Sequence, residues 1–409
     1  MTKTKLHQIM GSKPCARHIC GDGAEMLRYN CVVHNTYKKL CAAYEEEGYT
    51  LYCQDPALSG FLPESKTYIK GDEYAVIFFF SWEYQLHVTI SKKGARNLPD
   101  PSIAENAPEI CPMTITQPKT EQQGMCEIFR LTDGSFLIFD SSNRGAHDTI
   151  YQTLCDLNGS PEGIRIRMWV MTHVHGDHYG GFLGFAEKYA DAVTLDYMMY
   201  APVNRDVIAT IASYKNSWDT IDYFFNDGFE DYVKKYFPAT TLFTVHAGQR
   251  IKLPGATLRI LYSPEHLYIE RIPVNMNHGS LVIQVIGDEG KALIMGDSEH
   301  CSTYWVIKTH QNSLESDIFQ YPHHGSGRVP DLVTTVLSHS SVVLIPCVTP
   351  YYERNSNHLT HAVENWEWTR ATYIMGNGTV TLRMNGERVD GHVPASIKMN
   401  PGTGEDFHD

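Results

Sequence analysis

The sequence predicts an α/β fold in which packed sheets are flanked by helices, with a smaller α+β unit in front of it. Between about residues 126 and 385, strand-sized apolar runs alternate with helical patterns. Before them, residues 24–47 carry apolar side chains at close to helical spacing. Short alternating runs between residues 49 and 90 indicate an antiparallel meander.

A change of composition divides these two parts. The stretch 94–120 is rich in Pro and Asn and is typical of a connector. We therefore expect a small α+β domain over residues 1–114, whose role the sequence leaves open, and a second domain over residues 115–409.

Individual elements follow from the same periodicities. Gly48 ends the helix expected over 24–47, and Asp133-Gly134 forms the turn of a hairpin between CEIFRL and SFLIFD. AHDTIYQTLCDL predicts a helix, and IRIRMWVMT (164–172) predicts a strand with one face on a core. The aromatic segment 218–237 fits an amphipathic helix packed on the sheets better than a lid over a site.

Composition restricts location and partners. The formal net charge is −13, which disfavours long duplex nucleic acid as a partner. No apolar run is long enough for a membrane span, and no apolar segment follows the basic N-terminal residues, so we expect a cytoplasmic protein. Five of the ten cysteines lie within the first 53 residues without a Cys-x-x-Cys pair, so free thiols are favoured over structural zinc.

The segment MWVMTHVHGDHYGGF (168–182) concentrates metal-binding chemistry. His173 and His175 lie two residues apart on an extended segment, so both side chains can point the same way. Gly176 then allows a turn that aims Asp177 and His178 elsewhere. The arrangement suits two neighbouring ions, and imidazole with carboxylate suits zinc, with iron or manganese as alternatives.

His-x-His-x-Asp-His followed by Gly-Gly resembles the signature of the metallo-β-lactamase-fold superfamily. The resemblance covers about residues 115–390 and implies an αββα sandwich with two divalent metal ions at one edge of its two sheets. It assigns Asp297, after the apolar strand in GKALIMGDSEH, as the bridging ligand; the alternative is a helix N-cap.

Later segments supply the remaining ligands that the resemblance implies. YPHHGS (321–326) resembles the ending of the hydrolase domain of the bacterial competence (DNA-uptake) channel and its soluble relatives; there His324 is favoured as the ligand and His323 as a group facing substrate. His278 corresponds to the third histidine, although Asn277 and Ser280 fit the Asn-x-x-Ser version of the motif equally well. For His246 and His266, more distant alternatives, surface or loop roles are expected.

The expected function is that of a binuclear metal-dependent hydrolase, acting on a phosphodiester through a metal-bridging hydroxide. Asp177 steers the nucleophile's proton, His323 protonates the leaving group and Asn277 hydrogen-bonds an oxyanion. Ser326 or Arg328 holds a phosphate. The substrate is expected to be a small molecule or a single phosphodiester. A thioesterase or lactamase on the same site, and a metal-loaded binding module without turnover, stay open, as does the oligomeric state.

Overall fold

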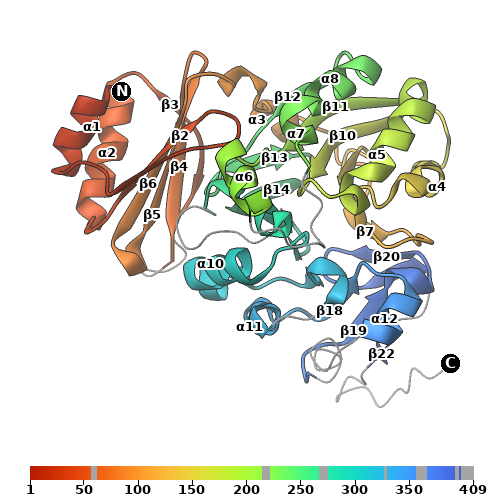
Figure 1. Ribbon diagram of the computed structural model, residues 1–409. Helices are drawn as coiled ribbons and strands as arrows, with labels where there is room; N and C mark the ends of the chain where they lie inside the picture. The colour runs from red at the N-terminus through yellow and green to blue at the C-terminus, as the bar shows by residue number, and fades with distance from the viewer. Residues whose placement is uncertain are drawn as a thin grey trace.

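Two eight-stranded sheets and one six-stranded sheet organise the molecule, with helices on their outer faces (Figure 1). The computed structural model describes residues 1–56, 62–213, 222–266, 275–326, 329–355, 366–391 and 396–397. Within them, the two eight-stranded sheets lie between helical layers. This is the αββα sandwich of the metallo-β-lactamase fold, as the sequence predicts.

The first sheet of the sandwich has the strand order β12-β11-β10-β9-β8-β7-β20-β21. Strands β9 to β12 run parallel, and the pairs on the β7 and β8 side are antiparallel. The strands are β7 (Thr114–Gln117), β8 (Cys126–Arg130), β9 (Phe136–Asp140), β10 (Ile164–Met171), β11 (Val193–Tyr200), β12 (Thr241–Phe243), β20 (Val380–Arg383) and β21 (Arg388–Gly391). The expected hairpin at Asp133-Gly134 is the β8–β9 pair.

The second sheet has the order β13-β14-β15-β16-β17-β18-β19-β22. Strands β16 to β19 are parallel to one another, and the remaining pairs are antiparallel. The strands are β13 (Arg250–Leu253), β14 (Ala256–Tyr262), β15 (Val282–Gly287), β16 (Lys291–Ile294), β17 (Ile318–Gln320), β18 (Val342–Ile345), β19 (Ala371–Ile374) and β22 (Ser396–Ile397).

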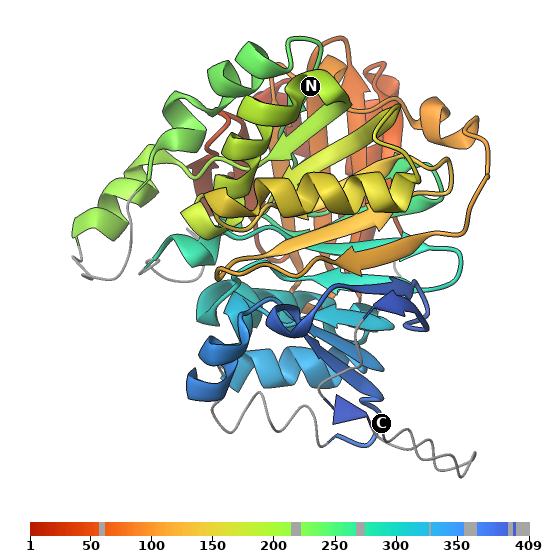
Figure 2. The same ribbon diagram turned by 90° about the vertical axis from the view of Figure 1, so that its right-hand side faces the viewer.

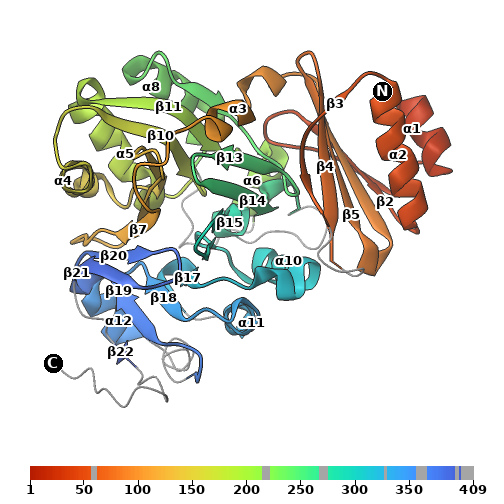
Figure 3. The same cartoon turned by 180° about the vertical axis from the view of Figure 1, so that it is seen from behind.

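Apolar side chains fill the space between the two sheets. Phe139 and Val170 of the first sheet share one buried cluster with Ile260 and Ile294 of the second. The helices are α4 (His147–Asn158), α5 (Gly176–Tyr189), α6 (Arg205–Ser213), α7 (Phe224–Asp227), α8 (Phe229–Tyr236), α10 (His300–His310), α11 (Val329–Ser338) and α12 (Thr349–Asn355). α4 and α5 lie beside β10 in Figures 1 and 3, and the C-terminal elements group together below them in Figure 2.

The expected helix over 218–237 is two short helices, α7 and α8, for the described residues from 222 onward. Residues 218–221 lie outside the described residues. Phe225 and Phe229 are buried in the apolar cluster beneath the helices. The expectation that this segment packs on the sheets is therefore confirmed for its described part. Gly228, with a non-helical φ of −148° and ψ of −11°, separates the two helices.

Strand β10 corrects the expectation of one buried face. Ile164 and Ile166 pack in the cluster under the helices, whereas Met168 and Val170 pack between the two sheets. The register with β9 shifts between Ile166 and Met168, and such a bulge turns the following side chains to the opposite face. Both faces of this central strand are therefore buried.

The N-terminal sheet is antiparallel, in the order β1-β2-β6-β5-β4-β3, which confirms the expected meander. Its strands are β1 (Ala16–Ile19), β2 (Glu25–Tyr29), β3 (Thr50–Asp55), β4 (Glu64–Lys70), β5 (Glu73–Phe80) and β6 (Gln85–Ser91). Helices α1 (Lys3–Met10) and α2 (His34–Glu46) cover one face (Figure 1). α3 (Pro101–Glu105) and β7 lie in the expected connector.

The expected helix over 24–47 was wrong in its first third. Residues Glu25–Tyr29 form β2, which pairs along its length with β6. Cys31 then takes a left-handed φ of 59°, which a helix cannot continue through, and α2 begins at His34. Sheet pairing with a strand nearly 60 residues away overrides the local periodicity.

The second face of the N-terminal sheet packs on the sandwich. Phe78 and Phe80 contact Trp305 of α10, and buried Asp55 pairs with Arg259 of β14. The division at residue 114 stays a prediction. No helix in the described part of the chain is long and apolar enough to cross a membrane. None of the ten cysteines forms a disulfide.

One buried carboxyl gives the fold a pH dependence. Glu127 on β8 is fully buried and accepts a hydrogen bond from Gln117 Nε2 at 2.9 Å. Burial raises its pKa to about 8, above the value near 4.5 of an unfolded chain. The protonated form therefore stabilises the fold fully below pH 4.5, and this contribution is lost as pH rises towards 8.

We expect Glu127→Gln to raise the free energy of unfolding relative to the wild type, with a difference that grows from pH 5 to pH 8. The gain is on the order of 4 kcal/mol, at 1.36 kcal/mol per pKa unit. Denaturant unfolding across this pH range measures it, with the exposed Glu162→Gln as the control. A difference that stays constant with pH would contradict the expectation.

Candidate metal centre

The end of β10 and the start of α5 carry the first half of the site. His173 lies in a bend after the strand, His175 is the extended residue that precedes α5, and Asp177 and His178 lie in the first turn of α5. The carbonyl oxygen of His175 accepts the backbone N–H of His178 at 2.9 Å, which closes that turn. One strand-to-helix junction therefore presents four polar side chains at the carboxyl edge of the sheet.

The glycines after the motif let α5 approach the first sheet. A Cβ on Gly181 would lie 1.9 Å from the carbonyl oxygen of Ser141, and one on Gly180 would lie 2.9 Å from the backbone nitrogen of Arg144. Neither position tolerates a side chain without displacing backbone. The Gly-Gly pair thus holds Asp177 and His178 close to the end of β9.

The second sheet supplies Asp297. β16 ends at Ile294, and Gly296 takes a left-handed φ of 56° beside Thr172, where a Cβ would be 2.9 Å from Thr172 Oγ1. The backbone N–H of Asp297 donates to Ser280 Oγ at 3.1 Å. The N-cap of α10 is Glu299, which forms a capping box with Ser302, so the alternative of Asp297 as an N-cap is wrong.

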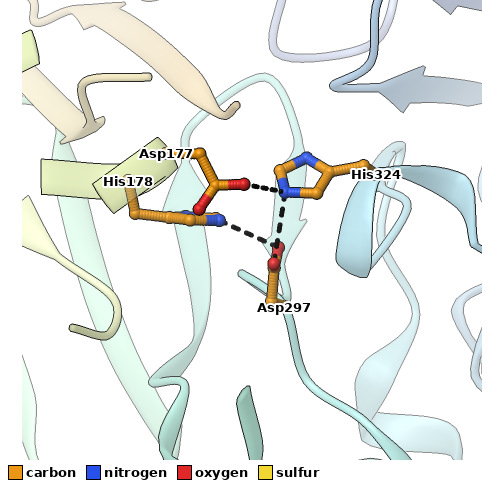
Figure 4. A group of neighbouring side chains, drawn as sticks. All are labelled: Asp177, His178, Asp297 and His324. Atoms are coloured by element: carbon orange, nitrogen blue, oxygen red, sulfur yellow. Dashed lines mark ion pairs between the residues drawn. The ribbon is translucent and has the colours of Figure 1, made fainter. Parts of the chain in front are cut away.

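The two halves meet in two sets of potential ligand atoms, each within 4.8 Å of one another. One set is Asp177, His178, Asp297 and His324, and the other is His173, His175 and Asp297. Figure 4 shows His178 and His324 directed at Asp297 from opposite sides. The distances to the Asp297 carboxylate oxygens are 3.1 Å from His178 Nε2, 3.2 Å from His324 Nε2 and 3.9 Å from His173 Nε2.

The histidines are oriented by bonds on their outer nitrogen. His178 Nδ1–H donates to Asp140 Oδ2 at 2.7 Å, and His324 Nδ1–H donates to the carbonyl oxygen of Pro346 at 2.8 Å. In each case Nε2 is left facing the group. This is the arrangement by which proteins position metal-ligating histidines, and the donor set therefore fits divalent metal ions.

Asp140 connects both sets and was missed by the sequence analysis. Its Oδ2 also accepts the Thr172 hydroxyl at 2.6 Å, and Thr172 Oγ1 lies 3.2 Å from His173 Nδ1. Asp140 thus orients His178 directly and His173 through Thr172. The available signal was an acidic residue ending the apolar run SFLIFD at a strand end.

The charges of the group favour a cation. Burial would raise the pKa of Asp297, but His178 and His324 outweigh it and hold that pKa well below its usual range. Burial would lower the pKa of His178, yet Asp297 and Asp140 raise it to about 10. Burial lowers the pKa of His173 well below its usual value, so this imidazole is already neutral, whereas His178 has to release its proton when a metal ion binds.

A second cluster lies against the ligand sets. His323 Nδ1 lies 2.7 Å from Glu299 Oε1 as an ion pair, and Asn277 Nδ2 lies 3.3 Å from both Glu299 Oε1 and His323 Nε2. Burial would raise the pKa of Glu299, but its hydrogen bond with His323 lowers it to about 2. Glu299 was not singled out in the sequence, where it reads as one more acid beside Asp297.

The other expected residues occupy different positions. His278 is buried in η6 (Met276–Gly279) and belongs to neither ligand set; its Nε2 lies 3.9 Å from Glu299 Oε2. Ser280 instead supports the backbone of Asp297. Arg328 and the side chain of His266 lie outside what the structure describes. His246 lies in a loop, as expected, but a surface role is wrong because it is 2% exposed.

Solved structures similar to this chain are metallo-β-lactamase fold proteins. The fold protein YhfI from Bacillus subtilis is 10% identical over 61% of this chain and 92% of that chain, with a TM-score of 0.37. CmlA, a diiron beta-hydroxylase from Streptomyces venezuelae, is 12% identical over 87% and 79%, with a TM-score of 0.41. Zn(2+)-bound PqqB from Methylobacterium extorquens is 9% identical over 51% and 72%, with a TM-score of 0.32.

No family model and no curated protein sequence matches the chain. Because the structural similarities are low in identity and in TM-score, the fold class rests on the strand order and the helical layers themselves. The closer relation to the competence hydrolases stays a prediction.

We expect Asp140→Asn to weaken metal binding by roughly 10–100-fold, because Oδ2 accepts from Thr172 Oγ1 and His178 Nδ1 while Oδ1 accepts the backbone N–H of Thr172, and an amide nitrogen can replace neither oxygen. Competition with a chelator of known affinity measures the change. Asp133→Asn, at the opposite end of the same hairpin and paired with Arg167, is the matched control. Equal affinities in the two variants would contradict the orienting role.

Proposed function

We propose that the chain is a binuclear metal-dependent hydrolase that cleaves a phosphodiester. The observation that carries the proposal is the position of Asp297, which is common to both sets of potential ligand atoms. One set is assigned to His173 and His175, the other to Asp177, His178 and His324, with Asp297 between them. His278 is not assigned as a ligand.

Two divalent cations bound by these residues would supply an acidified water and positive charge at the scissile group. The protein's own residues then account for substrate access and proton movement. The Asp177 side chain is 30% exposed, whereas those of Asp297 and His324 are 2% and 4% exposed. Asp177 therefore lies on the open side of the group, where it can accept the proton of an incoming water.

His323 is the proposed proton donor to the leaving group. Its side chain is 23% exposed and adjoins the ligand sets through His324. Glu299 Oε1 lies beside His323 Nδ1 at 2.7 Å, so Nε2 is the nitrogen left to exchange a proton with substrate. Asn277 Nδ2 lies beside that nitrogen and is placed to hydrogen-bond a developing oxyanion.

A phosphodiester suits this arrangement better than an acyl compound. Two cations bridged by a carboxylate are suited to in-line displacement at phosphorus, where the attacking and leaving oxygens both carry charge. The resemblance of YPHHGS to the competence hydrolases points the same way. The net charge of −13 favours a small or single phosphodiester over a long polyanion.

Metal content and hydrolysis of bis-p-nitrophenyl phosphate, measured together on the wild type and on Asp297→Ala, test the proposal. We expect about two ions in the proposed centre and turnover in the wild type, and loss of both from the centre in the variant. Ions in the centre without turnover on any phosphodiester would contradict the substrate class and redirect the search to thioesters, lactams and ligand retention. A wild type that binds no metal would overturn the binuclear centre.

His323→Asn tests whether His323 donates a proton without also acting as a metal ligand. With an unactivated alkyl phosphodiester we expect kcat to fall roughly 10²–10⁴-fold, with metal content unchanged. With p-nitrophenolate as leaving group, which departs without protonation, the loss should be far smaller. Equal losses on the two substrates would mean that His323 does not protonate the leaving group.

A further inference from the structure

A polar cavity of about 740 Å³ lies where the N-terminal sheet meets the sandwich. Its lining includes Cys20 and Asp22 from the turn between β1 and β2, Tyr74 from β5, and Thr244 after β12. None of these residues belongs to the proposed binuclear centre. The cavity is therefore a separate feature of the fold, built from both parts of the chain.

A cluster of metal-ligating side chains borders this cavity. Cys20, His246 and Glu265 each offer one ligand atom, and these atoms lie within 4.8 Å of one another. All three residues are buried, at 5%, 2% and 6% exposed. They come from three segments: the β1–β2 turn, the loop between β12 and β13, and η5 (Pro264–His266).

The imidazole of His246 is held from both sides. Nδ1 lies 2.8 Å from Glu265 Oε1, and the opposite nitrogen, Nε2, lies 2.8 Å from the Tyr74 hydroxyl and 3.3 Å from Asp22 Oδ2. The Nε2 side thus has the carboxylate partner that metal-ligating histidines usually have on their outer nitrogen.

The surrounding groups are fixed as well. Ser263 Oγ donates to Glu265 Oε1 at 2.6 Å, and Thr244 Oγ1 donates to Asp22 Oδ2 at 2.9 Å. The backbone N–H of Ala24 donates to Asp22 Oδ1 at 2.9 Å. Ligand atoms with restrained positions lose little freedom when an ion binds, which favours affinity.

Charge gives the cluster a reason to bind a cation. The buried Glu265 carboxylate, the partly buried Asp22 carboxylate and the Cys20 thiol face the single imidazole of His246, and buried charge is costly unless it is paired. Burial raises the pKa of the Cys20 thiol to about 12, so the thiol is protonated at neutral pH when no cation is present. A divalent cation would stabilise the thiolate and take up negative charge from Glu265.

We propose that Cys20, His246 and Glu265 form a second metal site that binds one zinc ion. The ion takes the place of the proton shared between His246 Nδ1 and Glu265 Oε1, and Cys20 Sγ is the third ligand. Binding releases the thiol proton and the Nδ1 proton to solvent, with no change of oxidation state. Thiolate with imidazole and carboxylate selects zinc over magnesium or manganese.

The site has two consequences for the protein. Three protein ligands leave a fourth position for water or a small ligand. Because Cys20 lines the cavity, this fourth position can be reached from it. The ion also joins the N-terminal sheet to the sandwich, because Cys20 belongs to the former and His246 to the latter. This assignment reverses the sequence-based expectation that the N-terminal cysteines bind no zinc.

Cobalt substitution of the full-length wild type tests the site without any variant. A thiolate bound to Co²⁺ gives a strong charge-transfer band in the near ultraviolet, and no cysteine belongs to either ligand set of the binuclear centre. We expect this band in the wild type and also in Asp297→Ala, in which the binuclear centre is impaired. Absence of the band in fully loaded wild type would overturn the proposal, whatever the outcome at the binuclear centre.

Zinc content assigns the site to Cys20. We expect about three ions per chain in the wild type and about two in Cys20→Ser, with hydrolysis of bis-p-nitrophenyl phosphate retained if the proposed function holds. Cys41→Ser, which changes another buried cysteine of the N-terminal unit, is the matched control and should keep three ions and the band. Equal zinc content and an unchanged band in Cys20→Ser would also overturn the proposal. If Cys20→Ser fails to fold, the charge-transfer band of the cobalt-substituted wild type still shows whether a thiolate binds the metal ion.

Discussion

The buried carboxylate of Asp297 is the constraint on which the site depends. A carboxylate that is 2% exposed must be compensated, and the surrounding elements are arranged to do this. Gln320 Oε1 accepts the backbone N–H groups of Met295 and Gly296, which fixes the end of β16. The imidazoles of His178 and His324 then approach the carboxylate from the two sheets.

The sandwich architecture explains why these groups meet. β9 and β10 in one sheet, and β16 and β17 in the other, are parallel strands whose carboxyl ends reach the same edge. Asp140 is the last residue of β9, His173 comes shortly after β10, and Asp297 comes shortly after β16. The apolar core between the sheets fixes the distance between these two edges. A packing defect far from the polar groups would therefore change the separation of the ligand atoms.

The N-terminal unit adds polar chemistry of its own. Its sheet contributes Cys20, Asp22 and Tyr74 to a cluster completed by His246 and Glu265 of the sandwich. The same face carries the aromatic contacts of Phe78 and Phe80 with Trp305. Apolar burial between the two parts thus places ionisable groups in a low-dielectric setting, where a cation has more effect than it would in water.

The sequence by itself determined the local chemistry: the His-x-His-x-Asp-His junction after an apolar strand, the strand before Asp297, and the sandwich class. The junction and the strand follow from short-range periodicity and spacing, which a single segment carries, whereas the sandwich class is what the resemblance of these motifs to the metallo-β-lactamase fold implies. The resemblance also favoured His324 over His323 as the group that faces Asp297. Only the tertiary structure decided that Asp140 and Glu299 lie beside histidines far along the chain, and that Cys20 meets His246. The tertiary structure also decided that residues 25–29 form β2, because the local periodicity alone predicts a helix there and the pairing with β6 cannot be seen in it. In each case the partner lies tens or hundreds of residues away, and side-chain contacts across that distance leave no pattern in either segment alone.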